Sequence, residues 1–180
     1  MNICVFCGSS LGNNPVYVQA ARELAHLFIQ SNSSLVYGGG NVGLMGVIAD
    51  AMLLEGGNVI GVIPDFLLKK EVGHKGITDL IVVSSMHERK KRMADLADAF
   101  IAMPGGLGTL DELAEILTWK QLTLIDKPIG LLNTNSYFTP LITQMEKMVD
   151  EGFLKKSSFA ELIIQQSPQQ LLISMGAVIV

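Results

Sequence analysis

Several features that would assign this chain to a broad functional class are scarce or missing from its 180 residues. The net charge is −4, so the chain lacks the positive field that attracts a nucleic-acid backbone. No run of 18 apolar residues is present, so no membrane span is expected. The segment Met1–Ile3 has no basic stretch and is typical of a strand rather than a signal peptide. We expect a cytoplasmic protein that binds neither nucleic acid nor membrane.

Cysteine and histidine are too sparse to suggest a metal centre. The two cysteines form a C-x-x-C motif, but Cys4 and Cys7 lie in an apolar strand-like run, where positions i and i+3 point to opposite faces. A redox C-x-x-C requires a helix N-terminus instead, so we interpret both as buried thiols, which fits a reducing compartment. No second ligand lies at metal-binding spacing from any histidine, and we interpret all three as structural: His26, His74 and His87.

The common nucleotide and nucleophile motifs are also missing. The chain has no Gly-Lys-Ser/Thr of a Walker A loop and no Gly-x-Ser-x-Gly nucleophile elbow. Its first glycine turn, Gly8–Gly12, is not G-x-G-x-x-G, and no acidic residue ends the second expected strand, Leu35–Tyr37. Binding of NAD and hydrolysis of ATP are therefore disfavoured, and we expect neither a cofactor nor a metal.

What the chain does have is a large apolar fraction arranged in alternating elements. Hydrophobic residues make up 49% and charged residues 17%, which is ample for a folded core. Short apolar runs alternate with helical patterns, which predicts a Rossmann-like, doubly wound parallel sheet in three α/β/α layers, as one domain over residues 1–180. Strands are expected at Asn2–Cys7, Leu35–Tyr37, Val59–Ile63, Leu80–Val83, Ala99–Met103, Ile129–Leu132 and Ala160–Ile164.

Helices are expected between these strands. Their predicted ranges are Val16–Gln30, Leu44–Glu55, Met86–Ala97, Leu110–Leu124 and Phe138–Asp150, with a short helix after Pro168. The stretch Pro64–Thr78 is interpreted as irregular and suited to a mobile flap. The Leu110–Leu124 pattern is apolar on more than one side, which indicates a subunit interface and predicts a homodimer or an assembly of dimers.

Glycine and serine turns follow four of the expected strands. In a doubly wound sheet such loops meet at the carboxyl edge, where ligands bind. We therefore expect one composite site there, formed by Gly8, Ser9, the Gly38–Gly40 turn with Gly39 and Gly40, the Ser84–Ser85 turn and the turn that begins at Pro104.

The turn that begins at Pro104 is the most informative segment. A glycine-rich turn between a strand and a helix N-terminus offers unpaired N–H groups to an anion such as a phosphate ester. Glu112 then places a carboxylate beside that anion, which phosphate binding alone does not require. A plainer alternative is a capping box with Thr109 as N-cap and Glu112 at N3.

Arg89 lies one turn into the helix that is expected to begin at the same edge of the sheet. Its planar charged side chain suits a phosphate or a carboxylate. The basic run Arg89–Arg92 equally fits a solvated helix face with an i,i+4 pair between Glu88 and Arg92. The residues alone leave open whether Arg89 grips the substrate or orients Glu112.

Four blocks of the sequence carry a family resemblance. The chain resembles the LONELY GUY (LOG) family, the cytokinin riboside 5′-monophosphate phosphoribohydrolases. The matching blocks are Pro104-Gly105-Gly106-Leu107-Gly108-Thr109-Leu110-Asp111-Glu112, Ser85-Met86-His87-Glu88-Arg89-Lys90, Gly38-Gly39-Gly40 with Gly43-Leu44-Met45-Gly46, and Phe6-Cys7-Gly8-Ser9-Ser10. Similar sequences also carry the label lysine decarboxylase, but nothing in this chain indicates pyridoxal chemistry.

The resemblance implies a Rossmann-like homodimeric enzyme that hydrolyses the N-glycosidic bond of a purine nucleoside 5′-monophosphate. The products would be the free base and ribose 5-phosphate, with cytokinin nucleotides or AMP as substrate. Arg89 and Glu112 would be the catalytic pair. Substrate contacts would come from Glu71, Met86, Lys90, Gly105, Gly106, Leu107, Gly108, Thr109, Leu110, Asp111 and Thr118.

A different class of function fits the same turns. Rossmann-like proteins also bind nucleotides for sensing, without turnover. In that alternative Glu112 would be no more than a helix cap, and a nucleoside 5′-monophosphate would be returned intact.

Overall fold

The computed structural model describes residues 1–71 and 73–178, apart from the side chains at positions 70 and 71. Within these ranges seven strands form one parallel sheet in the order β4-β3-β2-β1-β5-β6-β7. The strands are β1 (Asn2–Phe6), β2 (Ser34–Tyr37), β3 (Val59–Pro64), β4 (Asp79–Val83), β5 (Ala99–Ala102), β6 (Ile129–Leu132) and β7 (Leu162–Gln165). The order reverses between β1 and β5, which is where a doubly wound sheet opens a binding crevice.

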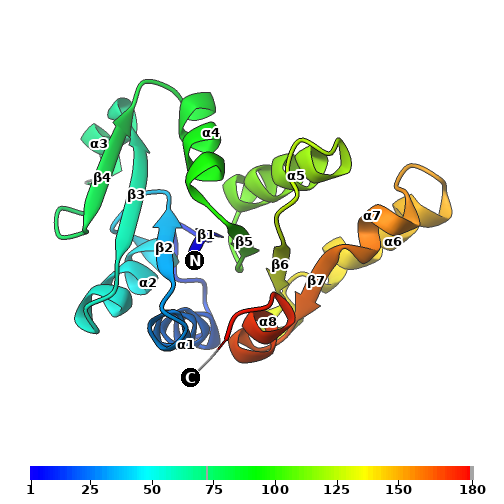
Figure 1. Cartoon of the computed structure of the whole chain (residues 1–180), viewed down its shortest axis with the longest axis horizontal. Helices are drawn as coiled ribbons and strands as arrows, with labels where there is room; N and C mark the ends of the chain where they lie inside the picture. The colour runs from blue at the N-terminus through cyan, green and yellow to red at the C-terminus, as the bar shows by residue number, and fades with distance from the viewer. Residues whose placement is uncertain (72, 179–180) are drawn as a thin grey trace.

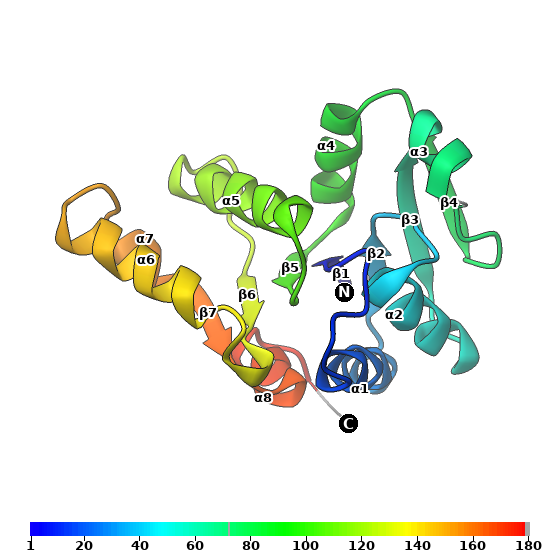
Figure 2. The same cartoon turned by 180° about the vertical axis from the view of Figure 1, so that it is seen from behind.

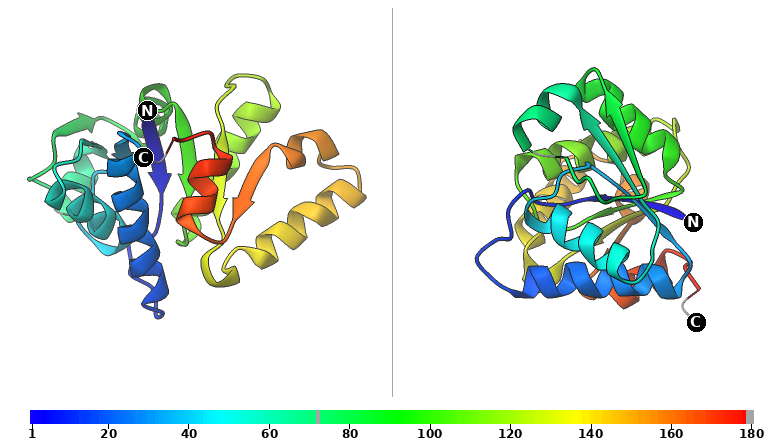
Figure 3. Two further views of the ribbon diagram at one scale, coloured as in Figure 1. Left: turned by 60° about the horizontal axis from the view of Figure 1, so that its bottom comes forward. Right: turned by 90° about the vertical axis from the view of Figure 1, so that its left-hand side faces the viewer.

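Helices connect these strands and cover both faces of the sheet. They are α1 (Val16–Gln30), α2 (Gly43–Leu54), α3 (Asp65–Glu71), α4 (Met86–Leu96), α5 (Leu107–Gln121), α6 (Thr139–Asp150), α7 (Lys156–Ala160) and α8 (Pro168–Ser174), with a 3₁₀ turn, η1 (Thr134–Ser136). Figure 1 shows α1, α2 and α8 on one face and α4 and α5 on the other, and Figure 2 shows the same layers from behind. The rotated views in Figure 3 show α1 and α8 lying across the same face.

The strand register explains why two separate apolar cores form. Cys4 pairs with Val36 on β2 and with Phe100 on β5, and all three side chains belong to the core beneath α4, α5 and α6. Cys7 belongs to the opposite core, beneath α1 and α2. Side chains alternate faces along a strand, so the C-x-x-C spacing separates the two thiols, as predicted. Both are free and buried.

The sequence predictions for the regular elements are largely confirmed. All seven strands are present, α1 and β6 have the predicted bounds, and the other predicted strands differ by up to two residues at an end. Two short helices were missed. The stretch Pro64–Thr78, expected to be irregular, contains α3, and α7 lies in the segment between α6 and β7. Both helices span at most seven residues, which is too short for a clear apolar period.

The most important correction concerns α5. It begins at Leu107 rather than Leu110 and ends at Gln121 rather than Leu124. Gly108 therefore lies inside the first turn of the helix, although glycine costs about 1 kcal/mol relative to alanine in a helix interior. The glycine-rich composition of the turn concealed the true start of the helix.

Candidate active site

The carboxyl ends of β1 and β5 open onto a cavity of about 260 Å³. Loops after these two strands form its walls, together with the first turns of α4 and α5 and side chains from α2 and α3. Its lining residues are Cys7, Gly8, Ser9, Met45, Leu67, Arg89, Gly106, Leu107, Gly108, Thr109 and Glu112. The predicted convergence of separate loops on one site is thus observed for the β1 and β5 loops and the start of α4.

The N-terminus of α5 faces this cavity without a side-chain cap. Gly106 is the N-cap in an extended conformation, and among the described side chains none accepts a hydrogen bond there. The first intrahelical bond runs from the Leu110 N–H to the Gly106 carbonyl. An α-helix leaves its first four N–H groups without internal acceptors, here those of Gly106, Leu107, Gly108 and Thr109. The helix dipole adds partial positive charge at the same place.

The alternative of a capping box at Thr109 and Glu112 is wrong. Thr109 is the third residue of α5, and its side chain is 3% exposed and packs against Gly105. A Cβ atom on Gly105 would lie 2.1 Å from the Thr109 hydroxyl, so the turn requires glycine at that position. The S-x-x-E pattern that does cap a helix lies on α4, where Ser85 accepts from the Glu88 N–H and Glu88 accepts from Ser84.

Glu112 is a largely buried carboxylic acid at the wall of the cavity. Its side chain is 12% exposed. Burial is the main cause that raises the pKa of Glu112 to about 7; the Arg89 guanidinium opposes that shift and the Asp111 carboxylate adds to it. A carboxyl group that titrates near neutral pH can hold or release a proton during a reaction, which is typical of an acid or base in catalysis.

Arg89 is held beside Glu112 by backbone carbonyl groups. Its Nε atom donates to the Val62 carbonyl at 3.1 Å, and its Nη2 atom donates to the Gly38 carbonyl at 3.0 Å. The remaining nitrogen, Nη1, lies 4.0 Å from a Glu112 carboxylate oxygen. Gly38 must lack a side chain here, because its Cβ would lie 2.0 Å from Arg89. Arg89 is therefore a fixed positive charge that faces Glu112, anchored to the ends of β2 and β3.

Lys90, predicted to contact substrate, is paired with carboxylates of α5. Its Nζ atom lies 2.8 Å from Asp111 and 3.2 Å from Glu115. The hydrogen bond with Asp111 raises the pKa of Lys90 above its usual value. Lys90 and Asp111 are absent from the described residues that line the Arg89–Glu112 cavity. The pairing ties the start of α4 to the start of α5 and so fixes the distance between Arg89 and Glu112.

Other predicted site residues lie around the cavity rather than in it. Gly105 lines a second cavity, beside Tyr137, and is not among the described residues that line the Arg89–Glu112 cavity. The Met86 sulfur contacts Arg89. Gly39 and Gly40, which follow Gly38 in the chain, are buried and are not among the described residues that line the cavity. Leu110 and Thr118 face a separate groove between α5 and α6. Glu71 ends α3, and its side chain is outside the described part of the structure.

Sequence reasoning missed three side chains that line the cavity: Cys7, Met45 and Leu67. Cys7 was assigned to the core, which is correct, but it also reaches the cavity wall. All three residues lie in apolar segments, and apolar residues are also typical of the core. The sequence pattern therefore could not show that these side chains border a cavity.

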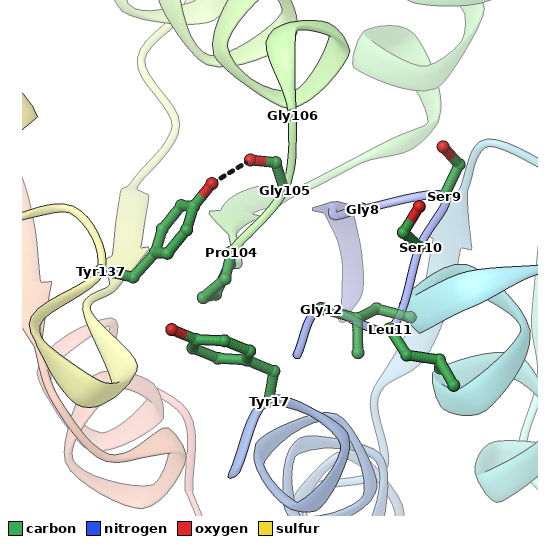
Figure 4. Close-up of a pocket in the computed structure, with 11 residues that line it drawn as sticks. Gly8, Ser9, Ser10, Leu11, Gly12, Tyr17, Pro104, Gly105, Gly106 and Tyr137 are labelled. Carbon is green, nitrogen blue, oxygen red and sulfur yellow. Dashed lines mark hydrogen bonds between the residues drawn. The ribbon is translucent and has the colours of Figure 1, made fainter. Parts of the chain in front are cut away.

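The second cavity, of about 290 Å³, also borders the Pro104–Gly106 turn (Figure 4). It is lined by the Gly8–Gly12 loop and by two tyrosines, Tyr17 and Tyr137. Gly8, Ser9 and Gly106 border both cavities. The turn and the start of the Gly8–Gly12 loop thus contribute to the walls of both cavities.

The α5–α6 groove is apolar and open. Its volume is about 390 Å³, and Leu113, Leu117, Met145 and Phe159 contribute to its walls. Phe153 at its rim is 85% exposed. α5 thus has an apolar side outside the main sheet core, and residues from α6 through α7 line the rest of the groove.

The three histidines are not among the described residues that line the Arg89–Glu112 cavity. His87 is exposed on α4, and His26 pairs with Glu55 on the surface. His74 Nε2 lies 2.8 Å from Asp50, which links the segment after α3 to α2.

Among the residues that the structure describes, no helix is both long enough and apolar enough to cross a bilayer.

Comparison with known proteins gives consistent matches over most of the chain. Residues 45–175 match the family model described as "Possible lysine decarboxylase". The chain is 51% identical over 166 residues to cytokinin riboside 5′-monophosphate phosphoribohydrolase LOG2 of Arabidopsis thaliana, covering 92% of this chain and 77% of that protein. It is 46% identical to the probable phosphoribohydrolase LOGL2 of Oryza sativa subsp. japonica, covering 94% and 70%.

A solved structure supports the fold at lower identity. The molybdenum cofactor binding protein from Rippkaea orientalis superposes with a TM-score of 0.72 at 24% identity, covering 97% of this chain and 94% of that one. At that identity the likeness shows a shared Rossmann-like α/β fold and nothing about the ligand.

Proposed function

The chain belongs to the LOG family of cytokinin riboside 5′-monophosphate phosphoribohydrolases, and from that premise we propose that it cleaves the N-glycosidic bond of cytokinin riboside 5′-monophosphates. Water is consumed, and the products are the free base and ribose 5-phosphate. The observation that carries the proposal is the presence of a buried carboxyl group, Glu112, and an open helix N-terminus in one cavity.

The open end of α5 is suited to the 5′-phosphate. The N–H groups of Gly106, Leu107, Gly108 and Thr109 lie at the positions of the helix that lack internal acceptors. A phosphate bound there gains hydrogen bonds and the favourable end of the helix dipole. Binding energy from this remote group can then hold the ribose in position during bond cleavage.

Glu112 is suited to act at the ribose. Cleavage of a glycosidic bond builds positive charge on the sugar ring in the transition state. An ionised carboxylate next to C1′ stabilises that charge and can orient the attacking water. Leu110 is the first residue whose N–H bonds within the helix, so Thr109 is the last one with a free N–H. Glu112 follows Thr109 by three residues, which places it about one helical turn from the proposed phosphate position.

Arg89 is suited to control the charge of Glu112. Two of its three nitrogens donate to backbone carbonyls, so the third faces the cavity and Glu112 in a fixed orientation. A nearby positive charge favours the ionised form of a carboxylate. We therefore assign Arg89 mainly to the orientation and ionisation of Glu112, with contact to the sugar through Nη1.

We also propose that the enzyme is a cytoplasmic homodimer formed through the α5–α6 groove. An apolar groove of this size with a phenylalanine exposed at its rim is typical of a subunit interface. A second copy of the chain is the occupant that the apolar second side of α5 predicts. Thr118 lies in this groove and not in the cavity of its own subunit. In a dimer formed through the groove, Thr118 could contact only a substrate bound to the other subunit. Sedimentation at micromolar concentration tests this proposal, since a stable species of about one chain mass would contradict it.

The decisive experiment separates cleavage from binding. The pure protein is incubated with isopentenyladenosine monophosphate and, separately, with AMP, and the free base is measured by chromatography. We expect free base from the cytokinin nucleotide, and the AMP arm measures how far the enzyme depends on the N6 substituent. Intact recovery of both nucleotides at high enzyme concentration would instead identify a binding protein without turnover.

A further inference from the structure

We propose that Tyr137 is a positioning residue of the phosphate subsite, because its hydroxyl holds the Gly105–Gly106 peptide in the orientation that presents the Gly106 N–H to the ligand. The inference rests on the proposed function, which assigns the open end of α5 to the phosphate of the substrate. It concerns a residue between η1 and α6, outside all four sequence blocks that carry the family resemblance.

The central contact crosses between distant segments of the chain. The Tyr137 hydroxyl donates a hydrogen bond to the Gly105 carbonyl, as Figure 4 shows. A trans peptide unit is planar, and its C=O and N–H point in opposite directions. The carbonyl of Gly105 and the N–H of Gly106 belong to one such unit. The Gly106 N–H therefore points away from Tyr137.

The opposite side of the turn is the side of the proposed phosphate site. In Figure 4 the Gly8–Ser9–Ser10 loop lies across the Pro104–Gly106 turn from Tyr137. Gly8, Ser9 and Gly106 line the cavity that holds Arg89 and Glu112, and Tyr137 is not among the described residues that line it. The hydrogen bond to Tyr137 thus turns a carbonyl oxygen away from that cavity and a hydrogen-bond donor toward it.

A glycine–glycine peptide needs such a restraint. Glycine occupies both signs of φ at little cost, so the peptide between Gly105 and Gly106 can rotate more easily than others. A rotated peptide would point its carbonyl oxygen at the phosphate and repel it. The preceding peptide is restrained by backbone, since the Pro104 carbonyl accepts from the Gly8 N–H at 3.1 Å. The Gly105 carbonyl has the Tyr137 side chain in that role.

Tyr137 is itself held firmly, although 42% of it is exposed. Its ring packs edge-on against Tyr17, with centroids 5.8 Å apart, and against Phe138, with centroids 5.0 Å apart. The two residues before it, Asn135 and Ser136, both have positive φ values, 54° and 58°. Such backbone is unfavourable for residues other than glycine and persists where the surroundings enforce it.

A buried hydrogen bond anchors this strained turn to the sheet. The Phe138 N–H donates to the Asn133 side-chain oxygen at 2.7 Å, and the Asn133 N–H donates to the Gln165 carbonyl at 2.8 Å. Asn133 follows β6 directly and is 6% exposed. The position of the Tyr137 hydroxyl is therefore fixed through β6 and β7, independently of α5.

The test is Tyr137→Phe, which removes the hydroxyl and keeps the ring contacts with Tyr17 and Phe138. Binding of inorganic phosphate and of ribose 5-phosphate is measured by calorimetry, and KM and kcat are measured with isopentenyladenosine monophosphate. We expect phosphate affinity to fall and KM to rise by roughly three- to tenfold, the range for one hydrogen bond, with kcat changed less than about twofold. Tyr17→Phe is the matched control, because it removes a hydroxyl from the neighbouring ring, and it should behave as wild type.

Each outcome decides the matter. Unchanged phosphate affinity in Tyr137→Phe, or an equal change in Tyr17→Phe, overturns the inference. A fall in kcat with unchanged KM also overturns it, because the hydroxyl would then act on the reaction rather than on phosphate binding. If the wild-type protein cleaves no nucleotide, the proposed function fails, yet the calorimetric comparison still tests Tyr137.

Discussion

Two helices begin at the carboxyl edge of the sheet, α4 after β4 and α5 after β5, and their N-termini differ. The start of α4 is closed by its own side chains, since Ser85 accepts from the Glu88 N–H and Glu88 accepts from Ser84. The start of α5 has glycine as its N-cap and, among the described residues, no side-chain cap. Lys90 on α4 is paired with Asp111 on α5, so the two starts are held together.

We propose that this difference reflects two roles, a scaffold at the start of α4 and a binding site at the start of α5. A capped helix end has satisfied N–H groups and offers little to an anion, whereas an open one loses stability until a ligand replaces the cap. The closed helix carries Arg89, whose position must be fixed, and the open helix carries Glu112 one turn beyond the free N–H groups. Substitutions at each helix start test whether these roles are separate.

The largest effect should come from Glu112→Gln. The substitution keeps the shape of the side chain and removes its charge, so the transition state loses its stabilising carboxylate. We expect kcat to fall by about a thousandfold while nucleotide affinity changes only a few-fold. Release of free base and equilibrium binding of the nucleotide are measured on the same preparation.

Glu23→Gln is the matched control for that variant. Glu23 is exposed on α1, on the opposite face of the sheet from α5, and it is not among the described residues that line the cavity. It should retain kcat within about twofold, the range of a surface substitution. Normal turnover in Glu112→Gln would show that the carboxylate is structural and that the mechanism is wrong.

Arg89→Ala should affect both stability and turnover. Removal of the guanidinium leaves the carbonyls of Gly38 and Val62 without a donor and Glu112 without its nearby positive charge. We expect unfolding to become easier by roughly 3 kcal/mol and kcat to fall by about a hundredfold. Arg89→Lys should recover only part of either loss, because one ammonium cannot bond both carbonyls and face Glu112.

The measurements for Arg89 are thermal unfolding and kcat at a temperature where each variant is folded. A variant that keeps its wild-type unfolding temperature but loses turnover would restrict Arg89 to the reaction. Normal turnover and normal stability together would place Arg89 on an ordinary helix face and remove it from the site.

The activity should depend on pH through Glu112. Burial raises the pKa of Glu112 from its usual 4.5 to about 7, and the ionised form is the one assigned to the reaction. The value of kcat/KM should therefore rise about tenfold per pH unit below pH 7 and level off above it. In Arg89→Ala the rise should move to higher pH, because Arg89 favours the ionised carboxylate.

The same shift has a consequence for stability with the opposite sign. The folded protein holds the Glu112 proton more tightly than the unfolded chain does, so this group favours folding fully below pH 4.5. That contribution is lost as the pH rises from about 4.5 to about 7. Urea unfolding of wild type and Glu112→Gln across this range measures it, and parallel curves for the two proteins would contradict the assigned pKa.

Gly106→Asp should make the start of α5 resemble that of α4. Gly106 has φ −93°, and a Cβ atom at this position would have no described atom within 4 Å, so aspartate fits there as an N-cap. Its carboxylate would bond the free N–H groups and stabilise the protein by about 1 kcal/mol. It would also occupy the phosphate site, so KM for the nucleotide should rise at least about tenfold through lost bonds and like-charge repulsion. A more stable protein with unchanged KM would place the phosphate elsewhere.

Most of the fold follows from the sequence because buried parallel strands and amphipathic helices leave regular patterns. The predicted bounds of α1 and β6 match the structure, and the C-x-x-C spacing correctly separates the two thiols between the two cores. Short elements such as α3 and α7 could not be predicted, because fewer than two helical turns do not establish a period.

The sequence predicts which segments come together at the cavity more completely than it predicts their partners. Arg89, Glu112 and the Gly106–Thr109 segment lie in one cavity, but the sequence could not show that Lys90 is paired with Asp111 and Glu115. It also gave no indication of Tyr137, because the residue lies 32 positions from Gly105 and its partner is a backbone carbonyl. Contacts between distant segments depend on the sheet order, which local patterns do not specify.

The chain has two S/T-x-x-E patterns at the starts of helices, and their local sequence does not show which of them caps its helix. Local sequence favours a capping box at Thr109 and Glu112 as much as at Ser85 and Glu88, and only the structure shows that the latter caps a helix. Ser85→Ala should lower the free energy of unfolding by about 1 kcal/mol, since the Glu88 N–H loses its acceptor.

Ser167→Ala is the matched comparison for Ser85→Ala. Ser167 caps α8 by accepting from the Gln170 N–H, on the opposite face of the sheet from α4. Both variants should lose a similar amount of stability in urea unfolding. Only Ser85→Ala should also raise KM, by about twofold, because the loosened start of α4 carries Arg89 and the Lys90 contact to α5. If the two variants had equal stability losses and both kept the wild-type KM, the closed start of α4 would support the fold without helping to position the site. If Ser85→Ala lost turnover by orders of magnitude, the two helix ends would not have separate roles.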